Sequence, residues 1–402
     1  MVTRGLHIVE LFILNWCYYR QRKLKMKTKK ILHIISSMDD GGAQRVVLDY
    51  LERKGSLNKY DLEFLSLNPP TNSTYDIYIK HNKLPFKYLE YKRSNMRFSY
   101  IRKAINWIRR TMALYRFIQE HNIYALHTHI TPIFIYVIFI FIVFQGEKFH
   151  TMHSDPYRFS KKFVLIVKFV FHFLHVHPIA VSEGQRQKAL IRYSLSECDV
   201  LRNSIDIAAI KEFADRKNNI ELRKKYNLPG NAFIIGSVGR LHPVKNYDGL
   251  IKIFAKYNKE RNKQSCLVIA GEGKERDNLL ALAESLDISG NVFLLGDIEH
   301  HNIYEFYKAI DLFMLVSHSE SSSIVTLEAQ AVGVRCLIAD TIPEDVIYRS
   351  NVRRMNYDAS YSEWISAIDD MAYINPLIYD AADNDLNTVM ARLEVIYDKY
   401  CN

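Results

Sequence analysis

Short runs of apolar residues alternate with longer segments of mixed polarity along most of this chain of 402 residues. Residues 31–35 and 312–316, for example, are almost continuously apolar. Such runs are typical of strands in a parallel sheet that is buried on both faces. Between the runs, apolar side chains recur at helical spacing, as at Leu250, Phe254 and Tyr257. The pattern therefore predicts an α/β protein with doubly wound parallel sheets.

The predicted strands form two series. They cover residues 31–35, 62–66, 124–127, 148–152, 179–181 and 199–201 in the first series, and 233–238, 266–270, 292–295, 312–316 and 336–339 in the second. A long apolar helix is expected over residues 163–176, before the strand at 179–181. We place the domain boundary near residue 204, so that residues 27–203 form one Rossmann-like domain and 204–384 another. Residues 1–26 are expected to be a separate N-terminal extension, and residues 385–402 to end in an amphipathic helix.

Charge changes sign at the same boundary. Residues 1–206 hold 32 Lys and Arg against 16 Asp and Glu, although the whole chain has a net charge of only +10. A basic first half favours an anionic partner, either a membrane surface or nucleic acid. From Ser99 onward a basic, aromatic segment reads as a helix with Ile101, Ile108 and Met112 on one face. Two interpretations stay open: a surface for anionic lipid, or an ordinary helix that packs on the sheet through this face.

Other patterns bound the class of protein. Residues 130–144 are strongly apolar but too few for a transmembrane helix, and residues 6–19 are interrupted by polar side chains and lack a signal-peptide cleavage site. The extension of residues 1–26 is either a start-site artefact or a tail that touches a membrane. Five scattered cysteines favour a reducing compartment and offer no metal-ligand spacing. We therefore expect no metal site and no cofactor.

Candidate chemistry lies just after the predicted strands. Glu320 follows the strand at residues 312–316, and Glu328 lies on the helix that begins near Ser323, the expected N-cap. The backbone amides of Ser322, Ser323 and Ile324 would form an anion-binding helix N-terminus. The alternative is that both glutamates are merely solvated.

Cations and histidines follow other strands. Gly239, Arg240 and Lys245 follow the strand at residues 233–238, and two cations beside a helix N-terminus suit a diphosphate. His129 and His153 end two strands of the first series, where ligands sit in open α/β sheets. For His129 a structural role is the main alternative. Gly41 and Gly42 open a helix after the first strand, where a plain tight turn explains them equally well.

Together these motifs resemble the retaining GT-B glycosyltransferases of family four, the glycosyl transferases group 1. The matching segments span residues 41–47, 151–154, 180–183, 202–206, 236–246, 269–273 and 320–333. The last of them, with the residues that follow it, is similar to members that build capsular polysaccharide or exopolysaccharide. The glutamate pair and the segment at 236–246 are fairly specific, whereas the glycine pair and the single histidines are not.

The resemblance implies two Rossmann-like domains that face a cleft. The first would bind the acceptor, the second would bind a nucleotide-sugar donor, and the C-terminal helix would pack back on the first. It assigns the following residues to the site: His153, Glu320, Arg240 and Lys245 to catalysis; Gly42, Gly239, Arg240, Lys245, Glu320, Ser322, Ser323, Ile324 and Glu328 to the donor; Gly41, His129 and Asn203 to the acceptor side of the cleft. Glu328 would hold the ribose, and no metal would be required.

The expected function is transfer of a sugar, with retention, to a lipid-linked or oligosaccharide acceptor in cell-surface polysaccharide synthesis. The enzyme would be cytoplasmic and peripheral, held at the inner face of the cell membrane by its basic first domain, with no nucleic acid as partner. Ser204, Ser321 and Arg335 stand where the family often has glycine, glycine and proline, which puts the identity of the donor in doubt. The alternatives are a sugar-nucleotide epimerase, a basic nucleic-acid-binding protein, or a catalytically silent partner subunit.

Overall fold

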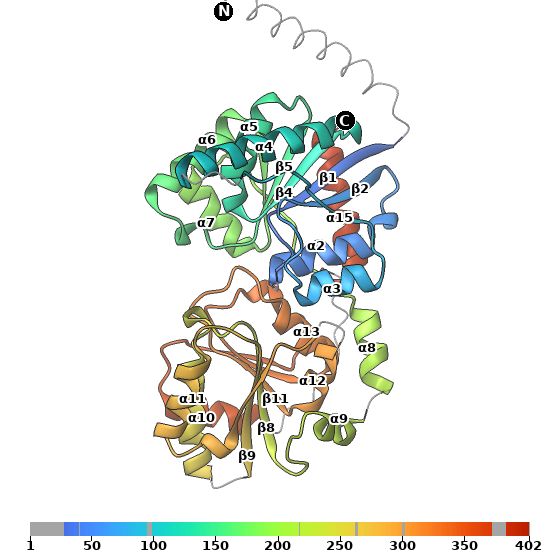
Figure 1. The fold of residues 1–402 in the computed structure, drawn as a ribbon. Coiled ribbons are helices and arrows are strands. Elements are labelled where there is room, and N and C mark those ends of the chain that lie inside the picture. Colours follow the sequence, from blue (N-terminus) through green and yellow to red (C-terminus); the bar gives the residue numbers. More distant parts are fainter. Residues whose placement is uncertain are drawn as a thin grey trace, which may run out of the picture. The chain divides into compact units, whose positions relative to one another are not determined.

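A computed structural model describes residues 28–39, 41–94, 99–216, 218–261, 264–299, 302–371 and 383–401 (Figure 1). The predicted extension of residues 1–26 lies outside the described residues. Contacts divide the chain into two compact units. Unit 1 takes the described residues of Met1–Ala180, Ala189–Asp199 and Met390–Asn402, and unit 2 those of Val181–Lys188 and Val200–Val389. Helices α7 (Glu183–Tyr193) and α15 (Leu386–Cys401) each contribute residues to both units.

Unit 1 is built on a seven-stranded sheet with the order β3-β2-β1-β4-β5-β6-β7. The strands are β1 (Lys29–Ile35), β2 (Tyr60–Ser66), β3 (Phe86–Tyr88), β4 (Ala125–His129), β5 (Glu147–Met152), β6 (Val176–Ala180) and β7 (Asp199–Val200). Its own helices are α2 (Gly42–Glu52), α3 (Thr74–His81), α4 (Ser99–Glu120), α5 (Phe134–Val143) and α6 (Lys161–Phe173). Buried aliphatic and aromatic side chains from both strands and helices form one apolar core.

Unit 2 repeats this topology in a six-stranded sheet with the order β10-β9-β8-β11-β12-β13. The strands are β8 (Phe233–Val238), β9 (Ser265–Ala270), β10 (Val292–Gly296), β11 (Leu312–Leu315), β12 (Arg335–Ala339) and β13 (Val352–Met355). The helices are α8 (Ile207–Arg216), α9 (Asn219–Lys225), α10 (Tyr247–Arg261), α11 (Arg276–Ser285), α12 (Ile303–Ala309), α13 (Ile324–Val332) and α14 (Tyr361–Met371). All its recorded strand pairs are parallel.

The predicted fold class is confirmed. Both sheets are parallel, and the first strand of each, β1 or β8, is an inner strand and not an edge strand, as in a Rossmann-like sheet. The short strands β3 and β13 and the helices α3, α8, α9 and α14 were not predicted. The predicted helix over residues 163–176 was too long. It ends as α6 at Phe173, and His175, with φ +50°, turns the chain into β6. The apolar pattern runs through this turn because both α6 and β6 are partly buried.

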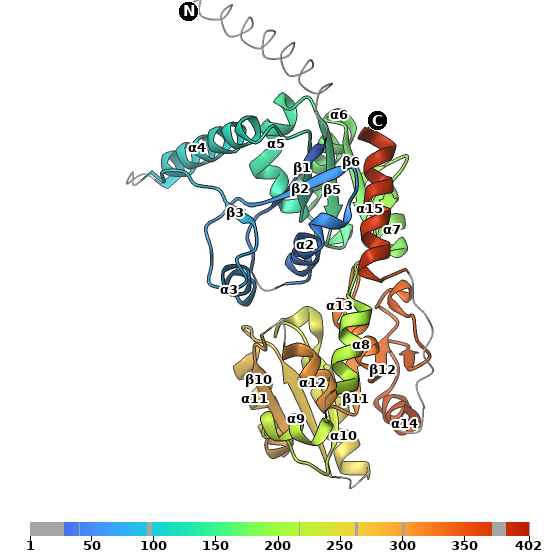
Figure 2. The same cartoon turned by 90° about the vertical axis from the view of Figure 1, so that its right-hand side faces the viewer.

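The basic helix α4 does not pack through the face that its sequence suggested. Its buried residues are Thr111, Leu114 and Ile118. The expected apolar face is open to solvent instead, with Ile101 49%, Ile108 50% and Met112 51% exposed. Helices α4, α5 and α6 lie side by side on unit 1 (Figure 1, Figure 2). No helix within the described ranges is both long and apolar enough to cross a membrane.

Candidate active site

The two central strands of unit 2 bring the main candidate residues together. Strands β8 and β11 are neighbours in the sheet, and the strand order reverses between them. In open α/β sheets, ligands bind at the carboxyl ends of the strands on either side of such a reversal. Lys245 lies in the loop that follows β8, and Glu320 in the loop that follows β11. The topology alone therefore places this lysine and this glutamate at the expected ligand position.

Lys245 and Glu320 form an ion pair there. The Nζ of Lys245 donates to the Oε1 of Glu320 at 2.6 Å, and the Ser317 hydroxyl donates to the same oxygen at 2.9 Å. The two side chains are 18% and 14% exposed, so the pair is largely withdrawn from solvent. The amide of His318 also donates to the carbonyl of Val244 at 2.8 Å, which joins the two loops through their backbones. Both charged groups are thus held in place before any ligand arrives.

Gly239 is required by the path of the lysine side chain. Its φ is +148°, and a Cβ built on it would lie 3.1 Å from the Cε of Lys245 and 3.1 Å from the Oη of Tyr247. The loop after β9 approaches as closely, since a Cβ on Gly271 would lie 2.2 Å from the carbonyl oxygen of Gly239. Backbone at this distance excludes a side chain at Gly271, whereas at Gly239 the positive φ and the two side chains make any other residue strained. Gly239 and Gly271 therefore allow the loops after β8 and β9 to pack closely next to the Lys245 side chain.

The N-terminus of α13 differs in one detail from the expectation. Ser323 occupies the N-cap position, but its hydroxyl hydrogen-bonds the hydroxyl of Thr326 at 2.8 Å and caps no backbone amide. Ser322 before it is half-buried, and Ile324 is the first residue of the helix. The first-turn amides are consequently not satisfied by the side chain that the sequence suggested.

Glu328 and Arg240 are placed differently from the ion pair. Glu328 is 4% exposed, and the hydroxyl of Tyr307 on α12 donates to its Oε2 at 3.0 Å. Burial and the nearby Glu328 carboxylate raise the pKa of the Tyr307 phenol well above its ordinary value, which keeps it a donor. Arg240 has an exposed side chain and makes no ion pair with any residue that the structure describes. Of Arg240, Lys245, Glu320 and Glu328, only Lys245 and Glu320 are directly joined by an ion pair.

The remaining candidates from the sequence lie at other positions. Gly41 is the N-cap of α2 in an extended conformation, and Gly42 is the exposed first residue of that helix. Asn203 is 6% exposed, and its carbonyl accepts a hydrogen bond from the side chain of Asn384 at 2.9 Å. His129 is fully buried at the end of β4. His153, just beyond β5, is half-buried, and its Nε2 lies 3.1 Å from the Nδ1 of His129.

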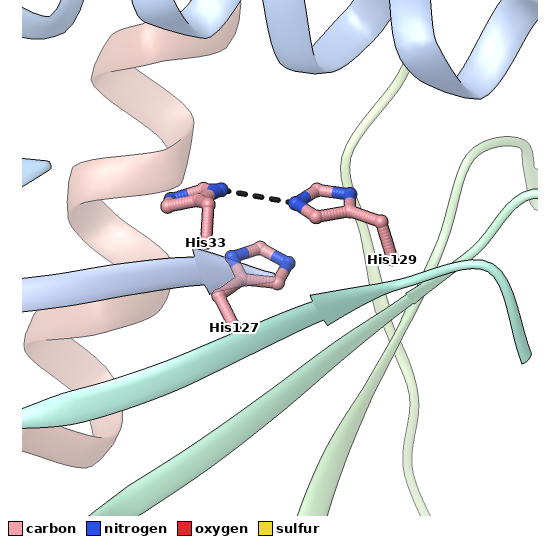
Figure 3. A group of neighbouring side chains, drawn as sticks. All are labelled: His33, His127 and His129. Atoms are coloured by element: carbon pink, nitrogen blue, oxygen red, sulfur yellow. Dashed lines mark hydrogen bonds between the residues drawn. The ribbon is translucent and has the colours of Figure 1, made fainter. Parts of the chain in front are cut away.

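Two further histidines complete a buried group that the sequence analysis missed. His33 on β1 is the register partner of His127 on β4, and its Nδ1 lies 2.9 Å from the Nε2 of His129 (Figure 3). A signal was available, because residues 127 and 129 alternate in a strand and must point to the same face of the sheet. Burial lowers the pKa values of His33, His127 and His129 well below that of a solvated histidine, so the rings are neutral.

The sequence alone offered no metal-ligand cluster, yet these three rings offer ligand atoms within 4.8 Å of one another. Their geometry favours hydrogen bonding. The rings of His127 and His129 stack with centroids 4.6 Å apart and planes 13° apart. A metal ion needs lone pairs that converge from the ring planes, and stacked rings do not provide them.

Comparison with known proteins decides the class of this chain. Residues 218–371, which contain β8 to β13 and the Lys245–Glu320 pair, match the family model described as glycosyl transferases group 1. The chain is a glycosyltransferase with the GT-B fold, and its match to group 1 lies within unit 2. A Bacillus subtilis protein named as glycosyltransferase EpsF is 26% identical over 351 residues, which are 85% of this chain and 87% of that protein.

Two other similarities bear on this glycosyltransferase. A Campylobacter jejuni enzyme is 32% identical over 161 residues, 40% of each chain. Its name is N-acetylgalactosamine-N,N'-diacetylbacillosaminyl-diphospho-undecaprenol 4-alpha-N-acetylgalactosaminyltransferase. The crystal structure of Anabaena HepE in complex with UDP superposes with a TM-score of 0.71 at 16% identity, covering 92% of this chain and 100% of HepE. At this identity the HepE likeness shows the fold alone.

Proposed function

We propose that this glycosyltransferase moves a sugar from a nucleotide-sugar donor to a lipid-linked glycan, with retention, during synthesis of a cell-surface polysaccharide. The observation that carries the proposal is the ion pair of Lys245 and Glu320 at the reversal point of the unit 2 sheet. Support for the donor class comes from HepE, which has been crystallised with UDP and with UDP-glucose. Support for the acceptor class comes from the Campylobacter enzyme, whose name includes an undecaprenol-linked acceptor.

In this proposal Lys245 stabilises the leaving group. Breaking the bond between sugar and phosphate leaves negative charge on the diphosphate, so a cation that is already positioned lowers the barrier. Glu320 holds Lys245 within reach of a diphosphate and shields its charge until the ligand competes for it. Arg240 is exposed and has an unengaged guanidinium to bring to the same anion. The amides of Ser322, Ser323 and Ile324 would face the donor at the helix N-terminus.

Glu328 would bind the nucleoside part of the donor. A carboxylate can accept hydrogen bonds from both hydroxyls of a ribose. Tyr307 on α12 orients the Glu328 carboxylate through its hydroxyl group. Because the pKa of Tyr307 is raised, the phenol stays neutral and adds no second negative charge beside Glu328. Glu320 and His153 would face the transferred sugar, and Gly42 would line its path. Gly41, His129 and Asn203 remain predicted for the acceptor side, with His129 acting from within the interior.

We propose that the reaction requires no metal, because cations of the protein neutralise the diphosphate. Full activity after treatment with EDTA supports this view, and restoration of a lost activity by Mg²⁺ or Mn²⁺ would contradict it. Retention itself is tested by NMR of the product, whose anomeric configuration should equal that of the donor.

Ligand-induced thermal stabilisation tests the donor site. In a panel of UDP, GDP and their sugar conjugates, the compounds that contain one of the two bases should raise the melting temperature of the wild type, since bound ligand stabilises the folded state by mass action. Lys245→Ala and Glu328→Gln should each abolish most of that rise. Lys252→Ala is the matched control for the lysine, since Lys252 pairs with Asp248 at 3.1 Å on the exposed surface of α10. A full rise in both site variants would refute the proposed placement.

The membrane part of the proposal rests on the exposed side of α4, α5 and α6. We call this surface the α4–α6 face, and its exposed apolar residues are Tyr100, Ile101, Ile108, Met112, Tyr115, Ile135, Tyr136, Phe139, Ile142, Leu165, Ile166, Phe169 and Phe173. Exposed cations on the same helices are Arg102, Lys103, Arg109, Arg116, Lys161 and Lys162. Helices that expose both aromatic and basic side chains suit the boundary of an anionic bilayer. A lipid-linked acceptor would be presented at that boundary.

Vesicle sedimentation tests the α4–α6 face. The wild type should sediment with vesicles that contain phosphatidylglycerol, and binding should weaken with salt. Phe139→Asp should reduce the binding constant by about tenfold or more, because burying one such side chain contributes about 1.5–3 kcal/mol. Ile220→Asp is the matched control, since Ile220 is 59% exposed on α9 of unit 2. Equal loss in both variants, or no wild-type binding, would remove the membrane assignment.

A further inference from the structure

A continuous line of hydrogen bonds runs through the interior of unit 1. We call it the histidine chain, and its members in order are Thr151, His127, Tyr397, His33, His129 and His153. The successive heavy-atom distances are 2.7, 2.6, 2.9, 2.9 and 3.1 Å. The members come from β1, β4, β5, the end of β5 and α15, so only the folded unit assembles the line.

The hydrogen bonds of the histidine chain can point in only two directions. A neutral imidazole carries one N–H and one lone pair, and a phenol carries one O–H. Both ring nitrogens of His33, His127 and His129 are engaged within the chain, so each ring must donate on one side and accept on the other. The members are neutral, because burial lowers the pKa values of these rings and raises that of Tyr397. All bonds therefore point toward His153 or all point toward Thr151.

Thr151 selects between the two directions. Its hydroxyl is 1% exposed and, in the part of the chain that the structure describes, has no hydrogen-bond partner except the Nε2 of His127. If His127 donated to Thr151, the hydroxyl proton would be buried without an acceptor. If Thr151 donates to His127, every group in the interior is satisfied. A buried donor without a partner is disfavoured roughly 5- to 150-fold, so the bonds point toward His153.

The consequence appears at the half-buried end of the line. His129 donates from Nδ1 to the Nε2 of His153, so the proton of His153 lies on Nδ1. We propose that the histidine chain holds His153 as the Nδ1–H tautomer, so that His153 presents a hydrogen-bond donor, and not a base, to a ligand oxygen. Thr151, Tyr397 and the three buried histidines are then positioning residues. Only the identity of that oxygen, as part of the glycosyl donor, rests on the proposed function.

The experiment is ¹⁵N NMR of the full chain labelled at histidine, without any ligand. The Nδ1 of His153, assigned with a His153→Gln variant, should have the shift of a protonated, pyrrole-type nitrogen. Thr151→Val removes the terminal hydroxyl at nearly constant volume, so that the Nε2 of His127 has no partner in either direction. The preference for one direction should weaken, and this signal should move measurably toward the unprotonated, pyridine type. Thr151→Ser restores a hydroxyl and should restore the wild-type signal. Thr128→Val is the matched control, because the Thr128 hydroxyl contacts the carbonyl of Phe149 at 3.3 Å and the Nδ1 of His150 at 2.9 Å, both outside the histidine chain.

Four outcomes would overturn the inference. The first three are a pyridine-type Nδ1 at His153 in the wild type, an unchanged signal in Thr151→Val, and an equal change in Thr128→Val. A fourth is binding of Co²⁺ by the wild type with shifts at all three buried rings, which would make the group a metal site. Because no nucleotide is present, failure here differs from failure of the proposed function. A correct tautomer without any stabilisation by nucleotide sugars would leave the histidine chain intact and refute the donor site.

Discussion

Acid should destabilise unit 1 far more than unit 2. Four histidines of unit 1, His33, His127, His129 and His150, are at most 1% exposed, and burial lowers the pKa of each well below 6.5. The unfolded chain binds protons at these rings below about pH 6.5, whereas the folded unit excludes them. Folding stability is therefore fully present above that pH and is lost as the pH falls through it.

The size of the effect follows from the number of rings. Between about pH 7.5 and pH 5.5, a histidine with an unfolded pKa near 6.5 and a much lower folded value loses about 1.4 kcal/mol of stability. Four such rings lose about 5 kcal/mol together, which is comparable to the whole stability of many domains. His153, whose pKa burial lowers to about 3, adds to this loss. Tyr50 and Tyr397 also face these rings, but burial raises the pKa of both phenols, so they stay uncharged. They do not offset the loss.

Urea unfolding at a series of pH values measures this loss for each unit separately. With the third tryptophan, Trp16, replaced by Phe throughout, Trp107 on α4 reports on unit 1 in a Trp364→Phe variant, and Trp364 on α14 reports on unit 2 in a Trp107→Phe variant. The buried histidines of the described residues all lie in unit 1, so the transition of unit 2 is the internal control. Replacing His150 by Gln should remove about a quarter of the loss expected from the four buried rings. A loss in unit 1 below about 1.5 kcal/mol, or an equal loss in unit 2, would refute the reasoning.

Other predictions concern unit 2. Gly239→Ala should weaken binding of the nucleoside diphosphate that stabilises the wild type at least tenfold in a calorimetric titration, because its φ of +148° strains any other residue and a methyl group would push against Lys245 and Tyr247. Arg223→Met should destabilise unit 2 by about 3–5 kcal/mol in urea, since it leaves Asp311, which Arg223 contacts at 2.7 Å, without its cation. Tyr307→Phe should raise the Kd for the same nucleoside diphosphate about tenfold by releasing Glu328, while inorganic pyrophosphate binding stays constant. Unchanged values in any of these assays would contradict the corresponding contact.

The sequence by itself determined the fold class and the meeting of Lys245 and Glu320 at one edge of a sheet. Buried parallel strands need continuous apolar runs, so β8 and β11 were visible in the pattern. Because loops after parallel strands share one edge of the sheet, Lys245 and Glu320 could be assigned to a common place from strand order alone. The glycines after β8 and β9 belonged to the same recognisable motifs.

Only the tertiary structure decided how the side chains at that edge pair and which surfaces stay open. Arg240 remains in solvent, whereas Lys245 pairs with Glu320, because the loop after β8 brings the Lys245 side chain past Gly239 toward that glutamate. The apolar face of α4 stays exposed because a different face meets the core of unit 1. His33 and His127 meet through strand register and Tyr397 reaches them from the far end of the chain, contacts that no local pattern encodes. Periodicity records which residues are buried, whereas their partners depend on how distant segments pack together.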